Sequence, residues 1–382
     1  MQTTRQGWGR RRWMTVIAAA LSALAVGLPT APAKATAVAT DPGADSLLVR
    51  FKPAVAGAAA SAALDRAGAE VGEQVGATGF LEISTDGQRA EEVRRRLLAS
   101  GLVDTVEPNR TRRALSVPSD PLYSSYQSPY LSAAGLPRAW DVTTGSDSLV
   151  LAVIDSGIDR DHPDLAGRLL TGRDIVNRDL DPTDDEGHGT MVTGVAGART
   201  NNGAGVAGIT WKGRILPIKV LDAEGVALDN DIAAGITWAV DQGADVINLS
   251  LGGPGASSVL QAAVNYAIAR DVVVVSAAGN LRPGIDPVEP HYPAACDGVI
   301  AVGATDGSNN LAAFSNYGSW VDLVAPGVDI YTTNRASGPA EAYAKVAGTS
   351  FAAPIVAGAA LLLRAADPSA SVATIADRLR RS

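Results

Sequence analysis

The sequence contains three histidines, which are its best candidates for proton transfer because only imidazole titrates near neutral pH. His188 lies in the segment Asp-Asp-Glu-Gly-His-Gly-Thr, where glycines on both sides leave room for a substrate backbone and permit a helix to begin nearby. His162, in His-Pro-Asp-Leu, and His291, in Pro-His-Tyr-Pro, fit loops equally well. Considered alone, each histidine fits a structural role better than a catalytic one.

An aspartate that could orient an imidazole follows the apolar run Val150–Ile154. A carboxylate at the end of a buried strand must be paired or hydrogen-bonded, because burying it alone is costly. A histidine N–H is a suitable partner for Asp155, since it would fix the ring and stabilise the imidazolium formed during proton transfer. The alternative is that Asp155 caps a turn at Ser156-Gly157.

A serine and an asparagine could complete an acyl-transfer site. Ser350, in Gly-Thr-Ser-Phe-Ala-Ala-Pro, begins a predicted helix, where free N–H groups favour negative charge. Asn280 follows a run of valines and could donate its amide to an oxyanion. The alternatives are a plain helix cap for Ser350 and a turn residue for Asn280.

The elements that would position these residues alternate between apolar strands and helices from residue 148 onward. This alternation predicts a three-layer α/β domain with a mostly parallel, buried sheet, in which chemistry gathers at the carboxyl ends of the strands. The predicted strands are Ser148–Ile154, Ile215–Val220, Asp245–Leu251, Val272–Ala277 and Gly298–Val302, and the predicted helices are Gly189–Ala198, Asp229–Gln242, Ser257–Arg270 and Ser350–Ala366.

A smaller module precedes this domain. Strands at Ser46–Lys52, Gly79–Thr85 and Leu102–Val106, with helices at Ala54–Ala69 and Arg89–Ser100, indicate an α+β unit of the β-α-β-β-α-β, ferredoxin-like kind. The segment 110–119, Arg-Thr-Arg-Arg-Ala-Leu-Ser-Val-Pro-Ser, is typical of an exposed linker.

Composition and charge narrow the function further. The 382 residues are 46% hydrophobic and 19% charged, which excludes a fibrous, disordered or polytopic membrane protein. Residues 114–382 hold 29 acidic and 17 basic side chains, so nucleic acid and anionic membranes are poor partners and cations are better ones. The single cysteine, Cys296, excludes an intrachain disulfide and is expected to be a small buried residue.

The first 35 residues have the layout of a secretory signal. Arg10–Arg12 form a basic region, an apolar run follows from Met14 to Leu28, and the stretch from Ala31 to Ala35 offers small-x-small cleavage sites. The run is short for a membrane span, although an N-terminal anchor is the alternative. Both general secretion and twin-arginine export fit. We therefore expect a secreted, extracellular protein that has no membrane partner after signal cleavage.

The motifs taken together resemble the subtilisin-like serine peptidases, and within them the thermitase-like secreted branch. They occur in the order Asp, His, Ser, and subtilisin is the standard example of that order. The motifs are Val153–Ile158, His162–Leu165, Gly187–Thr190, Ser250–Gly253, Ala277–Asn280 and Gly348–Ser350. The resemblance covers roughly residues 120–380, and residues 46–113 resemble the inhibitor-like propeptide of the family. It implies a signal peptide at 1–35, a propeptide at 36–115 and a peptidase domain at 116–382.

The resemblance also implies roles for the residues that match its motifs. Ser350 would attack the scissile carbonyl, His188 would transfer the proton, Asp155 would hold His188, and Asn280 with the Ser350 N–H would bind the oxyanion. The segments that would pair with substrate and line the P1 pocket are Ser250, Leu251, Gly252 and Gly253, and Ala277, Ala278 and Gly279. No charge is evident near Leu281, so we expect apolar P1 residues.

The same resemblance implies a structural calcium ion. Its ligands would be the side chains of Asp120, Asp164 and Asn202 with the carbonyls of Thr200, Ala204 and Val206, all of them the oxygen ligands that Ca²⁺ prefers. A second acidic cluster resembles another calcium loop with a different ligand set, and a solvated acidic loop is the alternative. Its members are Asp174, Asn177, Asp179 and Asp181.

The sequence departs from the family pattern at Met191 and Ile355, where histidines are usual, and at Phe351, where methionine is usual. None of the three supplies a catalytic atom. The chain also ends at Ser382, before the last strand and helix usual in the family.

The leading hypothesis is a secreted endopeptidase, a monomer that acts on polypeptides and is made as a zymogen inhibited by its own propeptide. Self-cleavage at Leu115–Ser116 would suit an apolar P1 pocket, and Arg113–Ala114 is the alternative bond. A non-catalytic binding module and a different hydrolase with the same triad are the competing hypotheses. No G-x-S-x-G elbow surrounds Ser350, which disfavours a lipase or esterase.

Overall fold

The structure is a computed structural model that describes residues 46–85, 89–110, 116–280, 289–335 and 341–382. The predicted signal peptide, both candidate processing bonds and Leu281 lie outside the described residues. Contacts divide the chain into two units, Met1–Arg112 and Arg113–Ser382. The boundary at 115–116 stays a prediction.

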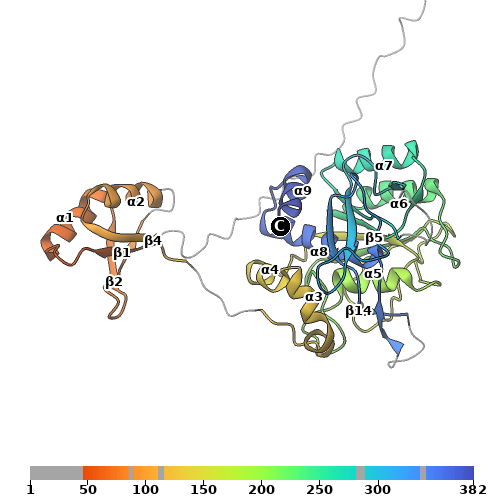
Figure 1. The fold of residues 1–382 in the computed structure, drawn as a ribbon, viewed down its shortest axis with the longest axis horizontal. Helices are drawn as coiled ribbons and strands as arrows, with labels where there is room; N and C mark the ends of the chain where they lie inside the picture. Colours follow the sequence, from red (N-terminus) through yellow and green to blue (C-terminus); the bar gives the residue numbers. More distant parts are fainter. Residues whose placement is uncertain (1–45, 86–88, 111–115, 281–288, 336–340) are drawn as a thin grey trace, which may run out of the picture. The chain divides into compact units, whose positions relative to one another are not determined.

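The first unit is a four-stranded antiparallel sheet in the order β2-β3-β1-β4, with two helices packed against it (Figure 1). Alternate residues of β1 are buried, so Leu47 and Val49 meet Leu64 and Leu97 of the helices in one apolar core. This confirms the ferredoxin-like α+β module. Its elements are β1 (Ser46–Phe51), α1 (Gly57–Ala67), β2 (Glu70–Gln74), β3 (Leu81–Ser84), α2 (Ala90–Ala99) and β4 (Val103–Pro108).

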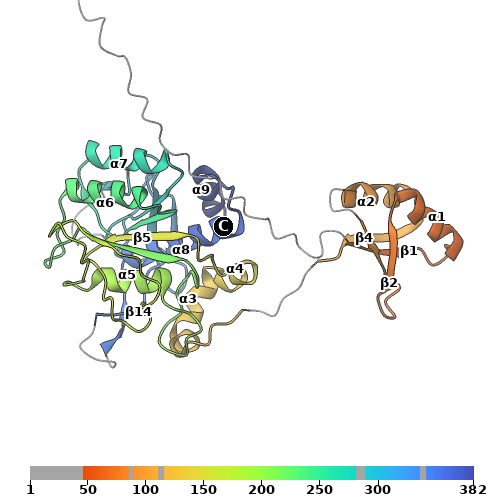
Figure 2. The ribbon, with the colours of Figure 1, turned by 180° about the vertical axis from the view of Figure 1, so that it is seen from behind.

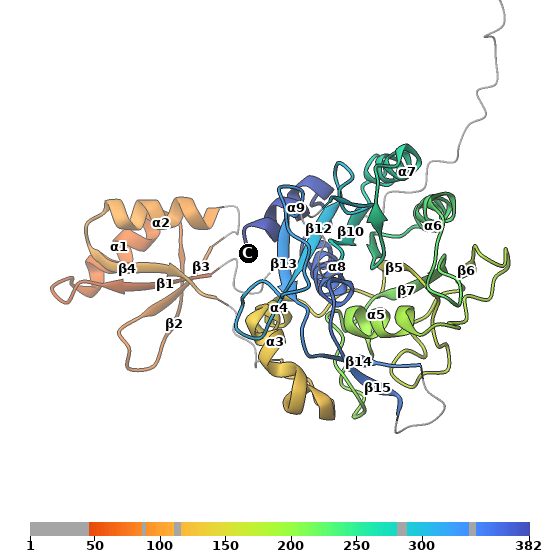
Figure 3. The ribbon, with the colours of Figure 1, turned by 45° about the vertical axis from the view of Figure 1, so that its right-hand side comes forward.

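The second unit is built on a seven-stranded parallel sheet in the order β13-β12-β10-β8-β5-β7-β6 (Figure 3). The expected mostly parallel sheet is therefore confirmed. The strands are β5 (Val150–Asp155), β6 (Arg173–Asp174), β7 (Arg214–Lys219), β8 (Val246–Leu249), β10 (Val273–Ala277), β12 (Ile300–Thr305) and β13 (Leu323–Pro326).

Helices cover both faces of this sheet and make the three layers. The side chains of β5 alternate between two cores, with Leu151 and Val153 on one face and Ala152 and Ile154 on the other. Figures 1 and 2 show α6 and α7 on one side of β5, and α5 and α8 on the other. These helices are α5 (His188–Gly197), α6 (Asp229–Asp241), α7 (Ser258–Ile268) and α8 (Thr349–Ala366).

Helix α8 is the central element of its layer and packs on β8, β10, β12 and β13. It is long and apolar enough to cross a membrane, but 72% of it is buried inside the unit, as expected of a core helix. The remaining elements surround this framework. They are η2 (Tyr123–Gln127), α3 (Ser128–Ala133), α4 (Leu136–Val142), β9 (Gly253–Pro254), β11 (His291–Tyr292), β14 (Ile330–Thr333), β15 (Tyr343–Val346) and α9 (Val372–Arg380).

Candidate active site

Asp155 and His188 meet at the carboxyl end of β5. The Nδ1 atom of His188 lies 2.8 Å from Oδ1 of Asp155, and that oxygen also accepts the main-chain N–H of Ser156 at 2.8 Å. The Asp155 side chain is 1% exposed, whereas that of His188 is 24% exposed. The carboxylate is therefore buried with its histidine partner, and the imidazole reaches toward solvent.

The other two histidines lie elsewhere. His162 is buried, donates from Nε2 to the Ala342 carbonyl at 2.8 Å and accepts the Asp164 N–H at Nδ1. His291 forms part of β11, which pairs with β9. The structure thus pairs His188, among the three candidates, with Asp155.

Glycine 189 allows α5 to approach β5 closely enough for this pair to form. A Cβ atom at this position would lie 2.2 Å from the Gly157 carbonyl oxygen and 3.2 Å from the Asp155 Cβ. Any larger residue would push the start of α5 away from the strand end, so the glycine after His188 is required by packing.

A third carboxylate, which sequence reasoning did not single out, organises this corner. Asp184 is buried and accepts the N–H groups of Gly187 at 2.7 Å and Thr190 at 2.9 Å, together with the Ser156 hydroxyl at 2.8 Å. Burial acts to raise the pKa of Asp184, but these donors outweigh it and the net pKa is lowered. The signal in the sequence was an aspartate just before a helix start, where a carboxylate satisfies unpaired N–H groups.

The electrostatics of this corner raise the pKa of His188 above the ordinary 6.5. Burial alone would lower it, because it disfavours the charged imidazolium. The Asp155 carboxylate opposes that effect by its charge and hydrogen bond, and the charges of Glu186 and Asp184 add to it. The histidine is thus a stronger base than a free imidazole.

Ser350 lies in the first turn of α8, beside the end of β8. Its hydroxyl donates to the Ser250 carbonyl at 3.1 Å, and the Ser250 hydroxyl donates to the Ser350 carbonyl at 2.8 Å. The ring of Phe351 is tilted against that of His188, with 5.6 Å between centroids. The described residues show no hydrogen bond from Ser350 to His188, and a rotation about χ1 would redirect the hydroxyl.

Asn280 is held so that its amide nitrogen faces Gly348 and the start of α8. Its Oδ1 accepts the Thr349 N–H at 3.0 Å and the Thr349 hydroxyl at 3.1 Å. A main-chain N–H can only donate, so the oxygen side is fixed and the NH₂ group points the other way. A Cβ at Gly348 would lie 3.4 Å from this Nδ2 atom.

The predicted substrate segments leave the sheet from the adjacent strands β8 and β10. Residues Ser250–Gly253 line a pocket of about 560 Å³ that also borders His188. The side chains of Ala277 and Ala278 are buried and do not line this pocket. Gly279 has a φ of +91°, and a Cβ there would lie 2.3 Å from the His291 Nδ1, so its backbone conformation and packing both require glycine.

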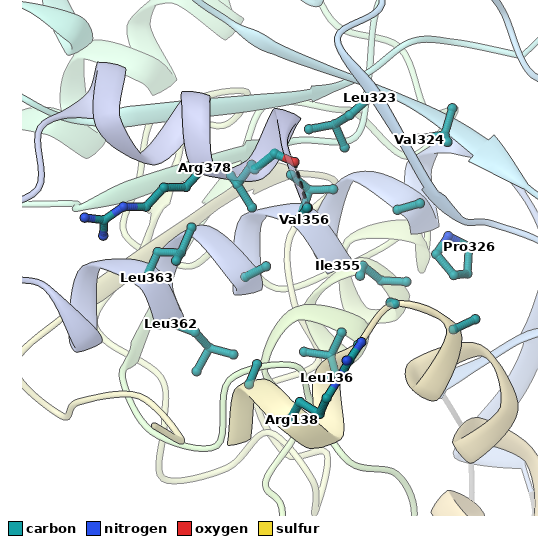
Figure 4. Close-up of a pocket in the computed structure, with 18 of the residues that line it drawn as sticks. Leu136, Arg138, Leu323, Val324, Pro326, Ile355, Val356, Leu362, Leu363 and Arg378 are labelled. Carbon is teal, nitrogen blue, oxygen red and sulfur yellow. Dashed lines mark hydrogen bonds between the residues drawn. The ribbon is translucent and has the colours of Figure 1, made fainter. Parts of the chain in front are cut away.

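A larger cavity of about 700 Å³ lies among α4, α8, α9 and β13 (Figure 4). Its apolar walls include Leu136, Leu323 and Ile355, with Arg138 and Arg378 also in the lining. Its lining contains none of the predicted site residues.

The residues predicted to bind calcium gather around the loop 199–206. Asp120 accepts the N–H groups of Asn201 and Asn202, and Asp164 accepts the Asn202 amide at 2.6 Å and the Val206 N–H at 3.0 Å. Both carboxylates are buried, and burial together with the nearby Asp164 charge raises the pKa of Asp120. Two buried, mutually repelling carboxylates fit a cation.

The rest of the predicted ligand set is close by. The Ala204 N–H donates to the Asn202 side-chain oxygen at 2.9 Å, and the Thr200 hydroxyl accepts the Gly208 N–H at 3.1 Å. Within the described residues, no three His, Cys, Asp or Glu side chains converge on a possible metal position. An ion here would therefore depend on amide and main-chain oxygens as well as the two carboxylates.

The second acidic cluster is bonded mostly within its own loop, although Asp181 also lies 3.5 Å from the Arg160 guanidinium. Asp174 accepts both the N–H and the side-chain amide of Asn177 at 2.8 Å, and Asp179 accepts the Asp181 N–H. Asp181 is directed toward Thr183 instead, with which it bonds at 2.7 Å. The calcium and solvated-loop interpretations both remain predictions.

Comparison with known proteins identifies the family. The subtilase family profile matches residues 146–382, and the profile of the fervidolysin N-terminal prodomain matches residues 29–109. The chain belongs to the subtilase family. It is a subtilisin-like serine peptidase with an N-terminal prodomain, which implies a zymogen that processes itself.

The relatives of this subtilase that have names are also serine peptidases of this family. Thermitase from Thermoactinomyces vulgaris is 47% identical over 255 residues, which are 66% of this chain and 88% of thermitase. The thermophilic serine proteinase of Bacillus sp. (strain AK1) is 47% identical over 277 residues, 72% of this chain and 66% of the relative. Among solved structures, a protease from Pseudoalteromonas arctica aligns with a TM-score of 0.64 at 36% identity, over 70% of this chain and 92% of that one.

Proposed function

We propose that this subtilase is a secreted endopeptidase that uses Asp155, His188 and Ser350 as its catalytic triad. The observation that carries the proposal is the 2.8 Å bond from His188 Nδ1 to the buried Asp155. Because Nδ1–H is donated to the carboxylate, the lone pair of Nε2 is left to take a proton. Ser350 lies at the start of α8, next to Phe351, whose ring packs against that of His188, and the reaction requires its hydroxyl to rotate toward Nε2.

The reaction follows from these positions. Ser350 Oγ attacks the scissile carbonyl while His188 takes its proton, and the imidazolium that forms is stabilised by Asp155. The negative charge that develops on the carbonyl oxygen is met by the Asn280 amide and the Ser350 N–H, which has no acceptor in the first turn of α8. His188 then gives its proton to the leaving amine, which departs and leaves an acyl-enzyme on Ser350. Water, deprotonated by His188, attacks the acyl carbon and releases the carboxylic acid product and the free serine.

Substrate is held as an extended strand along Ser250–Gly253 and Ala277–Gly279. Main-chain hydrogen bonds would give affinity for any polypeptide, and the side-chain pockets would give specificity. The small, uncharged character of these segments supports an apolar P1 residue. A cleavage profile dominated by arginine or aspartate at P1 would contradict this.

A calcium ion would be held by Asp120, Asp164 and Asn202, with the Thr200, Ala204 and Val206 carbonyls. The ion would offset the repulsion of the two buried carboxylates and tie the start of the peptidase unit to the loop 199–206. The ion would contribute to stability, because its ligands lie apart from His188 and Ser350 in the sequence and share no described hydrogen bond with them.

Secretion, removal of the prodomain and the monomeric state are part of the same proposal. The test is the intact mass and N-terminal sequence of the secreted protein, wild type beside Ser350→Ala. We expect the wild type to lose residues up to about 113–119 and the variant to keep them. In subtilisin, loss of the serine lowers kcat about 10⁶-fold, so a variant that processes at the normal rate would refute the triad.

A further inference from the structure

The pocket beside His188 carries negative charge that the reaction itself does not use. Two walls form it, the segment Gly225–Ala227 with Asp229 on one side and Ser250–Gly253 on the other, and Glu186 lies at its His188 end. Both carboxylates are on exposed residues, so a ligand in the pocket can reach them.

Glu186 is fixed in this position by a main-chain bond. Its Oε2 accepts the His188 N–H at 2.7 Å, which leaves Oε1 directed to the opposite wall. A Cβ at Gly225 would lie 4.0 Å from that Oε1 atom. Asp229 begins α6, where the helix dipole favours its charge. The two carboxylates thus border the same space from different elements.

Two described cations lie near the pocket, and neither is bonded to Glu186 or Asp229. Lys219 is buried and bonds Asp185, and the Arg335 guanidinium donates to the Asp185 carbonyl at 2.9 Å. In the part of the chain that the structure describes, neither Glu186 nor Asp229 forms an ion pair. Asp222 and Glu224 lie on the loop that contains Gly225–Ala227, but outside the lining of the pocket.

The geometry of a bound strand determines which substrate side chain enters this pocket. Successive side chains of a strand point to opposite faces, so P1 and P3 share one face and P2 and P4 share the other. Ser250–Gly253 borders both the predicted P1 pocket, shared with Ala277–Gly279, and the pocket beside His188. A substrate that sends P1 toward Ala277–Gly279 therefore sends P2 and P4 to the Glu186 side.

We propose that this pocket selects a lysine or arginine side chain at P2 or P4 of the substrate. Val226, Leu251 and Ile232 provide apolar wall for the aliphatic stem, and the carboxylates receive the charged head. The proposal rests on the proposed peptidase function and specifies its substrates. The proposed preference for an apolar P1 residue together with a basic residue at P2 or P4 distinguishes this enzyme from a peptidase with broad specificity.

The chain itself contains a segment with basic residues near a candidate cleavage bond. The linker contains Arg110, Arg112 and Arg113 just before the candidate processing bonds. Cleavage after Leu115 makes Arg112 the P4 residue, and cleavage after Arg113 makes it the P2 residue. Arg112 is therefore at P4 or P2 in the two registers, which are the positions that the proposal assigns to a basic side chain.

The test compares paired fluorogenic peptides with leucine at P1 and either arginine or citrulline, its neutral isostere, at one other position. The ratio of kcat/KM for the two peptides is measured in one enzyme, so any change in the basicity of His188 cancels. An exposed ion pair changes binding about two- to fivefold. We expect the wild-type ratio at P2 or P4 to be about five to 20 at low salt, and to fall as salt is raised.

Three variants assign the preference to its residues. Glu186→Gln and Asp229→Asn should each lower the ratio about two- to fivefold, and the double variant should bring it close to one. Glu224→Gln, on the same loop but outside the pocket lining, is the matched control and should leave the ratio unchanged.

A wild-type ratio near one, a preference at P3, or a ratio unaffected by both pocket variants would overturn the inference while leaving the peptidase function intact. If prodomain-free wild type cleaves none of the peptides nor denatured casein, the proposed function itself fails. These outcomes are distinguishable within a single set of assays.

Discussion

Thr349 holds the side chain of Asn280, and its hydroxyl can be removed with little change of shape by Thr349→Val. The hydroxyl donates to Asn280 Oδ1 at 3.1 Å and accepts the Gly279 N–H at 3.1 Å. The Thr349 main-chain N–H, which donates to the same Oδ1 at 3.0 Å, remains in the variant. The substitution therefore loosens the amide that would bind the oxyanion without removing it.

The expected magnitude follows from the number of bonds lost. One neutral hydrogen bond to Asn280 contributes about 0.5–1.5 kcal/mol. If this orientation free energy is lost from the transition state alone, kcat falls about two- to 13-fold, since about 1.4 kcal/mol corresponds to tenfold. Removal of a whole oxyanion donor from subtilisin costs about 10²–10³-fold in kcat, and we expect Asn280→Ala to fall in that range. KM should change little in both variants.

The assay is a double-mutant cycle on peptide hydrolysis, performed with enzymes whose intact mass shows that the prodomain is gone. If Thr349 acts through Asn280, then Thr349→Val should lower kcat in the wild-type background and have almost no effect in Asn280→Ala. Thr349→Ser keeps the hydroxyl and is the matched control, so its kcat should stay within about twofold of wild type.

Equal losses from Thr349→Val in both backgrounds would refute this reasoning, because the threonine would then act independently of Asn280. A loss expressed in KM would also refute it, since the hydrogen bond would then serve ground-state binding. The Gly279 N–H left without a partner lowers stability in both backgrounds and therefore does not affect the comparison.

Three other results are expected. In a pH–rate profile, the acid limb of kcat/KM should have its midpoint above pH 6.5, because His188 must be neutral to accept a proton and its pKa is raised. Glu186→Gln should move this midpoint to lower pH, and an unchanged midpoint would contradict the effect of the Glu186 charge on the pKa of His188. Excess EDTA should lower the Tm of the wild type but not that of Asp164→Asn, measured by scanning calorimetry, and an equal response in both would reject the calcium assignment. Gly189→Ala should lower the free energy of unfolding, measured in urea, by about 1–3 kcal/mol, because its Cβ would lie 2.2 Å from the Gly157 carbonyl oxygen. Gly203→Ala is the comparison: no atom lies within 4 Å of its Cβ, so this variant measures the cost of a positive φ alone.

Much of the fold could be predicted from the sequence because its elements carry strong periodic signals. The parallel strands are buried on both faces, so β5, β8 and β10 are mostly apolar runs, and the structure places them within a residue or two of their predicted bounds. Strand β2 was not predicted because all five of its residues are exposed, which leaves no alternation to detect. The cost of burying a lone carboxylate predicted that Asp155 has a hydrogen-bond partner, and the family resemblance implied that the partner is His188; the structure has a 2.8 Å bond between them.

The parts of the site that could not be predicted depend on loop conformation. Asp184 bonds groups from residues 156, 187 and 190, which come together only when α5 is seated against the end of β5. The position of Asp184 just before α5 indicates a helix cap, but nothing in the sequence indicates its bond to Ser156. The direction of the Glu186 side chain toward Gly225 could not be predicted either. It depends on a bond to the His188 N–H and on the path of a loop nearly 40 residues later in the sequence.

The topology explains why residues so far apart in sequence can form one site. Strands β5, β8 and β10 are neighbours in a parallel sheet, so their carboxyl ends meet at one edge, and Asp155, Ser250 and Asn280 follow from them in turn. Helices α5 and α8 pack on the same face of that sheet, and each begins at this edge. Their first turns bring His188 and Ser350 to the strand ends, where side chains accept the first N–H groups of both helices. The residues proposed as proton acceptor, nucleophile and oxyanion donors are thus placed by backbone elements whose positions the buried sheet determines. Substitutions at exposed residues beside the pocket, such as Glu186 and Asp229, are consequently expected to change substrate preference while the geometry of the proposed triad is retained.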